Sequence, residues 1–322
     1  MNPELLHQAC LLDAAGVIPG NGESSEEFFS RAQRTFDVQR KLFNTLTLSG
    51  RELIFDGIEV DLSRKVDDFL LDDARKLTDS IYGFKVEHIP GFFLSKSVGP
   101  LWGGCLIGDP DIDLAVFFLR DIFKEKEKWL FYSRTELGAH ELCHSARYAI
   151  NDPALEEYFA YQTSSSKLRR YLGNCFISDL DALLFVLPVL LLPIAQFMQL
   201  LFFPNMWVFP FWIIALCYPC YLFIRNLRAR KIVKRARIAL QSAEIEKPEA
   251  VLFRMTSEEI KETGRLKDKE EVLQYIRNKA GNELRWLVIE ERFIRNSEKQ
   301  EAPFKKIFHC LMQTTTLINI WR

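Results

Sequence analysis

The chain has 322 residues, of which 48% are hydrophobic, and a formal net charge of −1 at pH 7. It is long enough to bury a sizeable core, and its near-zero charge gives no support for a nucleic-acid partner. Its seven cysteines are scattered and odd in number, which argues against a disulfide framework and for reduced thiols.

The N-terminal third of the sequence predicts helices and short strands. Ser24–Glu27 has the pattern of a helix N-cap. Apolar residues within 54–60 indicate strands, which precede a predicted helix over 63–82. The stretch 92–107 is rich in glycine, which indicates a tight turn or a close approach of the backbone. Residues 113–119 have the pattern of a buried strand.

The clearest chemical signal is the motif His-Glu-Leu-Cys-His at 140–144. Residues four apart lie one turn above each other on a helix, so His140 and His144 can direct two imidazoles at one metal ion. Imidazole nitrogen suits Zn²⁺, and a catalytic zinc site needs three protein ligands and an open position for water. Glu141 follows the first histidine, where its carboxylate can accept a proton from that water.

A third ligand is expected from the helix that follows the turn at Asn151–Pro153. Glu156 and Glu157 both lie at the start of that helix, so both are candidates. Adjacent helical residues point about 100° apart, and only one of the two can readily face the metal. The other is expected to complement the dipole at the N-terminus of the helix.

Three more residues lie near the motif. Tyr161, one helical turn after Glu157, and Arg147 are candidate donors to an oxyanion. Glu136 lies one turn before His140, where it could accept a hydrogen bond from a metal-bound imidazole. The alternative for all three is packing or contact with solvent.

The stretch 135–161 resembles the gluzincin metallopeptidases, whose second helix carries a ligand glutamate with a small residue three positions later. The segment from Glu157 to Ala160 fits that pattern, so the resemblance favours Glu157 and leaves Glu156 as the runner-up. In zincin-like peptidases a strand before the HExxH helix pairs with the extended substrate. Residues 101–107 and 113–119 are the two candidates for that strand.

From 182 to 224 the sequence has no charged residue over 43 positions. Crossing about 30 Å of hydrocarbon takes about 20 helical residues, so this run is long enough for two spans. A turn at Pro204–Met206 divides it into legs over 182–203 and 207–224, and several tryptophans and tyrosines suit the membrane interface. We expect a transmembrane helical hairpin, with the core hairpin of a soluble protein as the alternative.

Basic residues flank the hairpin on both sides, while its turn has no charge. The positive-inside rule therefore places both soluble parts in the cytoplasm, and we expect an integral protein of a bacterial inner (cytoplasmic) membrane. The same basic residues can contact anionic headgroups. They are Lys167, Arg169, Arg170, Arg225, Arg228, Arg230, Lys231, Lys234, Arg235 and Arg237.

The C-terminal part of the sequence predicts further amphipathic helices. Thr256–Glu259 is an N-cap pattern, and helices are expected over 269–276 and 283–294. The segment 304–312 is amphipathic with a basic edge, which suits a membrane surface or packing on the rest of the chain. These helices are candidates for binding a partner protein.

Together these patterns predict an α+β, mostly helical fold in three parts. The first is a zincin-like metallopeptidase domain over 1–178, with active-site helices at about 135–165. A transmembrane helical hairpin over 179–226 follows, and a cytosolic helical region over 227–322 ends the chain.

The layout is similar to that of membrane-bound gluzincins, the prenyl-protein endopeptidases and the bacterial heat-shock membrane peptidase. It differs from them in placing the candidate ligand Glu157 before the hairpin, and in having Tyr161 where the family has Asp. The resemblance implies a membrane-anchored, zinc-dependent endopeptidase that cleaves membrane or membrane-proximal proteins. The alternatives are a membrane adaptor or sensor with a structural or degenerate zinc site, and a zinc-dependent amidase or other hydrolase that acts on a small or lipid-linked substrate.

Overall fold

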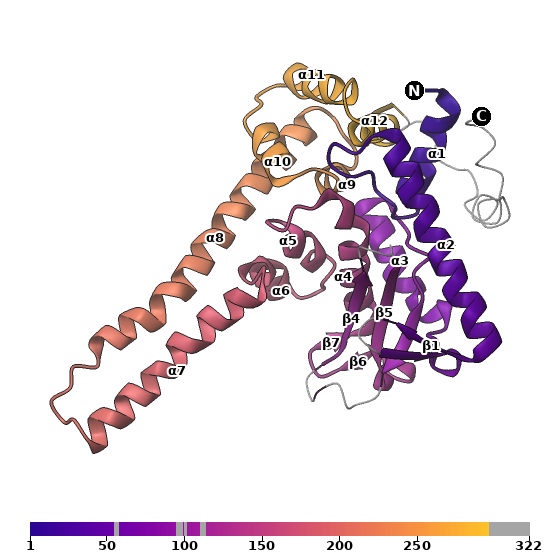
Figure 1. Cartoon of the computed structure of the whole chain (residues 1–322). Helices are drawn as coiled ribbons and strands as arrows, with labels where there is room; N and C mark the ends of the chain where they lie inside the picture. The colour runs from indigo at the N-terminus through magenta and orange to yellow at the C-terminus, as the bar shows by residue number, and fades with distance from the viewer. Residues whose placement is uncertain (55–57, 95–98, 100–101, 110–113, 296–322) are drawn as a thin grey trace.

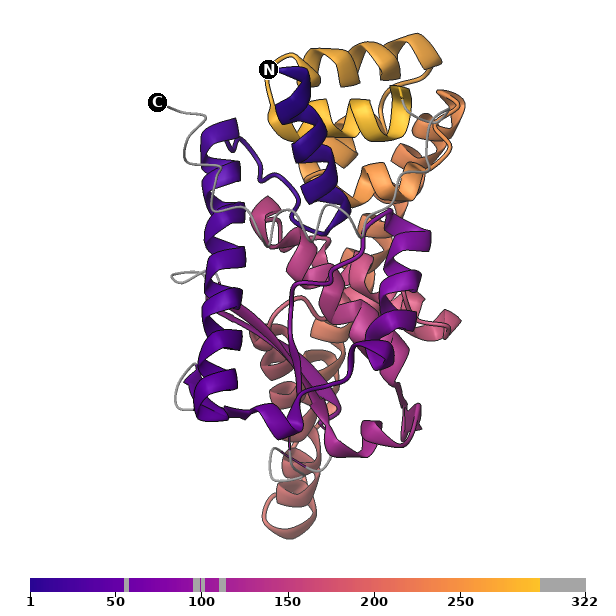
Figure 2. The same ribbon diagram turned by 90° about the vertical axis from the view of Figure 1, so that its right-hand side faces the viewer.

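The computed structural model describes residues 1–54, 58–94, 99, 102–109 and 114–295, and it is mostly helical with three small sheets (Figure 1). A body formed by both ends of the described chain carries the sheets, and a long helical hairpin projects from it (Figure 2). The body buries its apolar side chains, whereas the hairpin exposes most of its own.

The N-terminal part begins with two helices, α1 (Pro3–Ala14) and α2 (Ser25–Ser49). The predicted N-cap is confirmed, because Ser24 and Glu27 form a reciprocal capping box at the start of α2. The strands predicted around 54–60 are also confirmed as an antiparallel pair, β1 (Arg51–Ile54) and β2 (Ile58–Asp61).

The helix predicted over 63–82 begins later than expected, as α3 (Asp68–Tyr82). Residues Leu62–Arg64 form instead a 3₁₀ turn, in which the Asp61 carboxylate accepts the Ser63 N–H at 2.8 Å. The Val66 N–H then donates to the Gly91 carbonyl at 2.8 Å. The backbone just before α3 is therefore bonded to the first residue of a strand and is not available to a helix.

The central sheet contains three strands in the order β3-β5-β4. Strand β5 (Leu114–Arg120) is buried in the middle, which confirms the strand predicted at 113–119, although Asp113 lies outside the described residues. Strand β3 (Gly91–Leu94) is parallel to β5, and β4 (Gly104–Asp109) pairs with it antiparallel and forms an edge.

The helix of the histidine motif, α4 (Arg134–Arg147), starts directly after a short hairpin of β6 (Lys128–Trp129) and β7 (Tyr132–Ser133). The Ser133 hydroxyl caps α4 by accepting from the Glu136 N–H. Helix α4 packs on α3 at Gly138, where an added Cβ would come within 3.0 Å of the Ala74 methyl. A 3₁₀ turn (Tyr148–Ile150) then leads to α5 (Glu156–Tyr161), which lies beside α4.

The next segment leads from α5 to the hairpin. It contains α6 (Lys167–Leu172) and a 3₁₀ turn (Gly173–Cys175). Helices α7 (Asp179–Leu201) and α8 (Phe209–Ser242) then form the hairpin and pack along each other.

Both helices of the hairpin are long and apolar enough to cross a membrane, by length and composition. Only 6% of the apolar window of α7 is buried, and 17% of that of α8. Helix α8 does not end at Ile224, as the predicted second leg does, but continues as one helix to Ser242 in the body.

The C-terminal helices complete the body. They are α9 (Pro248–Phe253), α10 (Ser257–Thr263), α11 (Lys269–Ala280) and α12 (Leu284–Glu290), followed by a π-helical turn (Glu291–Arg295). The N-cap predicted at Thr256 is confirmed by a capping box with Glu259. The amphipathic segment predicted at 304–312 lies outside the described residues.

One core joins the two ends of the chain. A single cluster of buried apolar residues contains Phe117 and Phe159 together with Phe253 and Trp286. Buried ion pairs add to this connection, since both Asp13 and Arg254 have fully buried side chains that meet at 2.8 Å. Residues 227–295 are therefore packed into the same body that carries α4 and α5.

Candidate metal centre

Helices α4 and α5 bring three candidate ligands together. The Nε2 atoms of His140 and His144 are 3.1 Å apart. One carboxylate oxygen of Glu157 lies 3.6 Å from the His140 Nε2, and the other lies 3.4 Å from the His144 Nε2. Among the described residues, these three form the group of His, Cys, Asp and Glu side chains that could hold a metal ion.

The separations fit a tetrahedral ion. Two ligand atoms at about 2.0–2.1 Å from a tetrahedral zinc are about 3.3–3.4 Å apart. The two imidazole nitrogens, and the carboxylate oxygen nearest to each, lie within a few tenths of an ångström of that value. With one ligand atom taken from each of the three residues, all three atoms lie within 4.8 Å of one another. Two imidazoles and one carboxylate are also a ligand set found at catalytic zinc sites with an open fourth position. The donor set and its spacing thus suit Zn²⁺.

Glu156 occupies a different place from Glu157. Its Oε1 lies 3.5 Å from the Nδ1 of His144, on the far side of the imidazole ring from the Nε2 that faces Glu157. Its Oε2 accepts a hydrogen bond from the Arg147 Nε at 3.0 Å. Glu156 is therefore placed to orient His144 through the second ring nitrogen, as carboxylates commonly do for metal-bound histidines.

Arg147 is fully buried and does not line the pocket beside the histidines. Its Nη1 donates to the Phe253 carbonyl, and its guanidinium lies 4.6 Å from the centre of the Phe159 ring. It is thus not placed to donate to an oxyanion, and packing, the alternative expected for it, is what the structure shows. Instead it connects Glu156 to helix α9 of the C-terminal region.

The pKa values of the two histidines are shifted in opposite directions by burial and by neighbouring charges. Burial, with the nearby His144, lowers the pKa of His140 to about 3, so its imidazole is neutral at pH 7. Burial also lowers the pKa of His144, but the hydrogen bond to Glu156 and the charges of Glu157 and Glu141 outweigh it and raise the pKa. Burial raises the pKa of Glu157.

Glu141 faces the edge strand of the sheet. Its Oε2 accepts a hydrogen bond from the Leu106 N–H of β4 at 3.1 Å. Burial raises the pKa of Glu141 to about 7, although the charge of His144 and the Leu106 N–H lower it. A carboxyl group with a pKa near neutrality can both take and return a proton at pH 7.

A pocket of about 370 Å³ opens beside these groups. It is lined by His140 and Glu141, by Gly104 of the edge strand, and by Phe131 and Tyr132 of the β6–β7 hairpin. Of the two candidate strands, the one at 101–107 overlaps β4 (Gly104–Asp109), which forms an edge of the sheet and packs beside α4. The other, at 113–119, lies in the middle of the sheet as β5.

Tyr161 and Glu136 also line this pocket. The Tyr161 ring packs edge-on against the His140 imidazole, with ring centres 4.7 Å apart. Gly173 makes room for it, since an added Cβ would lie 2.2 Å from the Tyr161 ring. Glu136 binds the turn after α5 rather than an imidazole: it accepts from the Ser164 hydroxyl at 2.9 Å and the Ser165 N–H at 3.0 Å.

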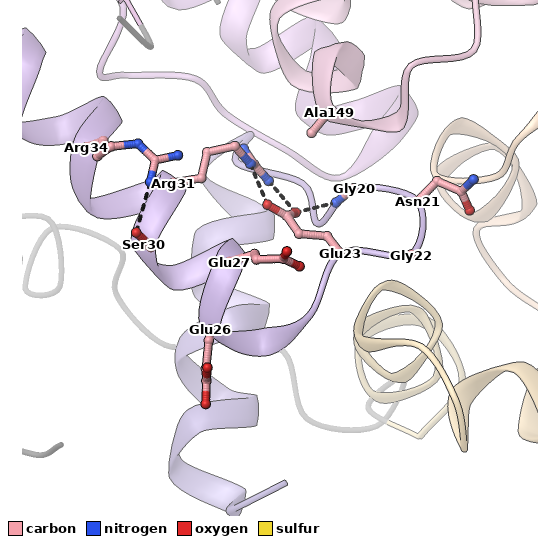
Figure 3. A pocket seen from close by; sticks show the side chains of 10 residues that line it. All are labelled: Gly20, Asn21, Gly22, Glu23, Glu26, Glu27, Ser30, Arg31, Arg34 and Ala149. Atoms are coloured by element: carbon pink, nitrogen blue, oxygen red, sulfur yellow. Dashed lines mark hydrogen bonds and ion pairs between the residues drawn. The ribbon is translucent and has the colours of Figure 1, made fainter. Parts of the chain in front are cut away.

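A larger depression of about 710 Å³ lies at the start of α2 and reaches Ala149 (Figure 3). Within it, Glu23 pairs with Arg31 at 2.8 Å and accepts a hydrogen bond from the Gly20 N–H. Arg34 donates to the Ser30 hydroxyl at 2.9 Å. We assign no chemistry to this depression.

Comparisons with known proteins identify no relative. No family model matches the chain, and neither a curated protein nor a solved structure is similar to it.

Two features of the site are not visible in the sequence. Leu106 contributes only a backbone N–H, which depends on strand pairing and not on the type of side chain. The second feature is the pair of carbonyls that face Arg147. They belong to Phe253 and Met255, which lie 106 and 108 residues further along the chain. The motif HExxH with an arginine three residues later gives no sign of this contact.

Proposed function

We propose that the protein is a membrane-anchored, zinc-dependent endopeptidase whose active site faces the cytoplasm. The observation that supports this proposal best is the convergence of His140, His144 and Glu157, which offer two imidazole nitrogens and a carboxylate within 4.8 Å of one another, a ligand set found at catalytic zinc sites. The adjoining pocket and edge strand supply room for an extended chain.

His140, His144 and Glu157 would hold the ion, which when bound lowers the pKa of a water and polarises the scissile carbonyl. Glu141 accepts the proton of the attacking water and returns it to the leaving amine as the C–N bond breaks. The Leu106 N–H holds one oxygen of Glu141, and the other oxygen is the one that we propose accepts the proton. Tyr161, beside His140 in the pocket, is our candidate donor to the oxyanion.

The membrane placement comes from the hairpin. Its exposed leucines and phenylalanines suit a hydrocarbon environment, and basic residues follow it along α8. The positive-inside rule places the body, and with it the metal centre, in the cytoplasm. A protein segment at or near the membrane is then the substrate within reach.

Elemental analysis of detergent-purified protein tests the ligand set. We expect about one zinc per chain in the wild type and in Glu156→Ala, and loss of zinc in Glu157→Ala, because only Glu157 faces both Nε2 atoms. Zinc retained in Glu157→Ala and lost in Glu156→Ala would reverse the assignment. Absence of zinc from every form, after purification without chelator, would favour the adaptor function instead.

Glu141→Gln tests the chemistry separately. The amide keeps the size of the side chain but cannot accept the proton, so we expect normal zinc content and a fall in proteolysis of about 10²–10⁴-fold. Comparing membrane proteomes of cells with the wild type or this variant should reveal stabilised membrane proteins. Full proteolytic activity in the variant would rule out the mechanism, and unchanged membrane proteins would favour a hydrolase of small molecules.

A further inference from the structure

Exposed apolar side chains gather on the β6–β7 turn at the mouth of the metal pocket. Leu130 and Phe131 form this turn, and they are 58% and 75% exposed. Phe131 itself lines the pocket. Large apolar side chains that stand in water next to a binding site commonly mark an interaction surface.

A second group of exposed apolar residues lies on and after α6. Its members are Leu168, Tyr171, Leu172 and Phe176. Two of them already touch the hairpin: Tyr171 lies 6.4 Å from Phe223 of α8, and Phe176 lies 5.5 Å from Phe185 of α7, between ring centres. This group therefore continues the apolar surface of the hairpin onto the body.

The two groups flank the same opening. Arg169 of α6 lines the pocket together with Phe131, and its guanidinium lies 5.8 Å from the centre of the Tyr132 ring in β7. Both the β6–β7 hairpin and α6 lie on the side of the body from which α7 and α8 project (Figure 1). We call these six residues, Leu130, Phe131, Leu168, Tyr171, Leu172 and Phe176, the apolar rim.

The position of the hairpin decides which surface covers this rim. Helix α7 begins at Asp179, three residues after Phe176, so a bilayer that contains α7 has its surface beside α6. Exposed basic side chains stand near the rim and after the hairpin, at Lys128, Lys167 and Arg228. They suit the anionic headgroups at that depth, while leucine and aromatic side chains suit the boundary between headgroups and acyl chains.

We propose that the apolar rim inserts into the interfacial layer of the bilayer that holds the hairpin, so that the metal pocket opens at the membrane surface. The proposal rests on the proposed function and narrows its substrate class. The substrate would be a protein segment that leaves the bilayer and enters the pocket within a few residues of the membrane. A soluble protein would have to compete with lipid for the mouth of the pocket.

Photocrosslinking in lipid nanodiscs of phosphatidylcholine and phosphatidylglycerol tests the rim. The photoreactive residue p-benzoylphenylalanine replaces Phe131, which it resembles in shape, and lipid adducts are detected by mass spectrometry. Tyr148 is the matched control: it is also aromatic and exposed, but it follows the other end of the 14-residue helix α4, about 21 Å from β7. Phe197 of α7 reports on the hairpin itself.

We expect lipid adducts at positions 131 and 197 and none at position 148. Adducts at 197 without adducts at 131 would overturn the proposal that the apolar rim contacts lipid, but would still support a membrane-spanning hairpin. Equal adducts at 131 and 148 would also overturn it, because lipid contact would then not distinguish the two surfaces. No adduct at 197 would overturn the membrane placement, and the rim with it. The measurement needs neither substrate nor zinc, so a failure of the peptidase proposal leaves these results unchanged.

Discussion

The body and the hairpin differ in how far they expose leucine side chains to solvent. Leu119, in the middle strand of the sheet, is completely buried, whereas Leu190, midway along α7, is 52% exposed. In the body, apolar residues face inward and ion pairs such as Asp13–Arg254 are buried among them. In the hairpin, leucine, isoleucine and phenylalanine cover the outside of two helices.

This difference teaches that hydrophobicity alone does not identify a core. Burial of apolar surface stabilises a fold because it removes that surface from water. Where an apolar side chain faces lipid instead of water, burying it adds no such stabilisation. The body thus has the buried apolar core of a protein in water, whereas the hairpin has the exposed apolar surface expected of helices in lipid. Substitutions of the same kind should have different consequences in each.

The largest expected difference comes from truncating a leucine in each region. Leu119→Ala removes fully buried atoms and leaves a cavity, which should lower the free energy of unfolding of the body by about 2–5 kcal/mol. Leu190→Ala removes atoms that face outward, so it should leave that free energy nearly unchanged. Denaturant unfolding in detergent, followed by the fluorescence of the buried Trp286, measures both. Equal losses would show that the hairpin belongs to the core of a soluble protein.

Acid should destabilise the body through His88. Burial, with the charge of Arg75, lowers the pKa of this imidazole from 6.5 to about 4. The neutral form is favoured in the folded state, so its stabilisation is complete above pH 6.5 and is lost as the pH falls from 6.5 towards 4, because the unfolded chain binds the proton first. The difference in pKa corresponds to about 3 kcal/mol.

Unfolding of the wild type and His88→Gln at several pH values isolates this contribution. The variant should lose less stability between pH 6.5 and 4, since its amide does not titrate in that range. The uncharged stretch of the hairpin has no histidine or carboxylate, so the acid effect is assigned to the body. An identical pH dependence in both proteins would show that the pKa of His88 is the same in the folded and the unfolded chain.

The smallest expected change comes from substituting Glu156. Its carboxylate contacts both the buried Arg147 and the candidate ligand His144. Glu156→Gln weakens the contact with the His144 Nδ1 and the ion pair with Arg147. We expect a loss of zinc affinity of about 10–100-fold, measured by competition with a chelator. Glu136→Gln is the control, because Glu136 lines the pocket but binds serines instead. Unchanged affinity in Glu156→Gln would show that Glu156 does not orient the ligand.

Local patterns in the sequence predict the parts of the fold that depend on neighbouring residues. The capping boxes at Ser24 and Thr256 and the buried strand at Leu114–Arg120 are examples, since each needs only residues within one turn or one strand. The two long apolar helices follow from an uncharged run in the same way. The spacing of His140 and His144 is likewise a property of one helix.

Long-range contacts are what the sequence does not reveal. Residues 227–295 look like a separate helical region, yet Phe253 and Trp286 belong to the same core as Phe117. Arg147 looks like a surface or pocket residue, yet it is buried against carbonyls from α9. In both cases the decisive partner lies over a hundred residues away, where no periodicity or spacing can indicate it.

Helix α8 has a consequence for the membrane placement that we propose. Its 34 residues form one continuous rod of about 51 Å, with Phe209 at the hairpin turn and Leu240 in the core of the body. No flexible linker separates the anchor from the folded part. In the membrane placement that we propose, the body therefore does not move above the lipid as a tethered domain does. The helix that enters the bilayer also sets the height and tilt of the face that carries the pocket beside His140.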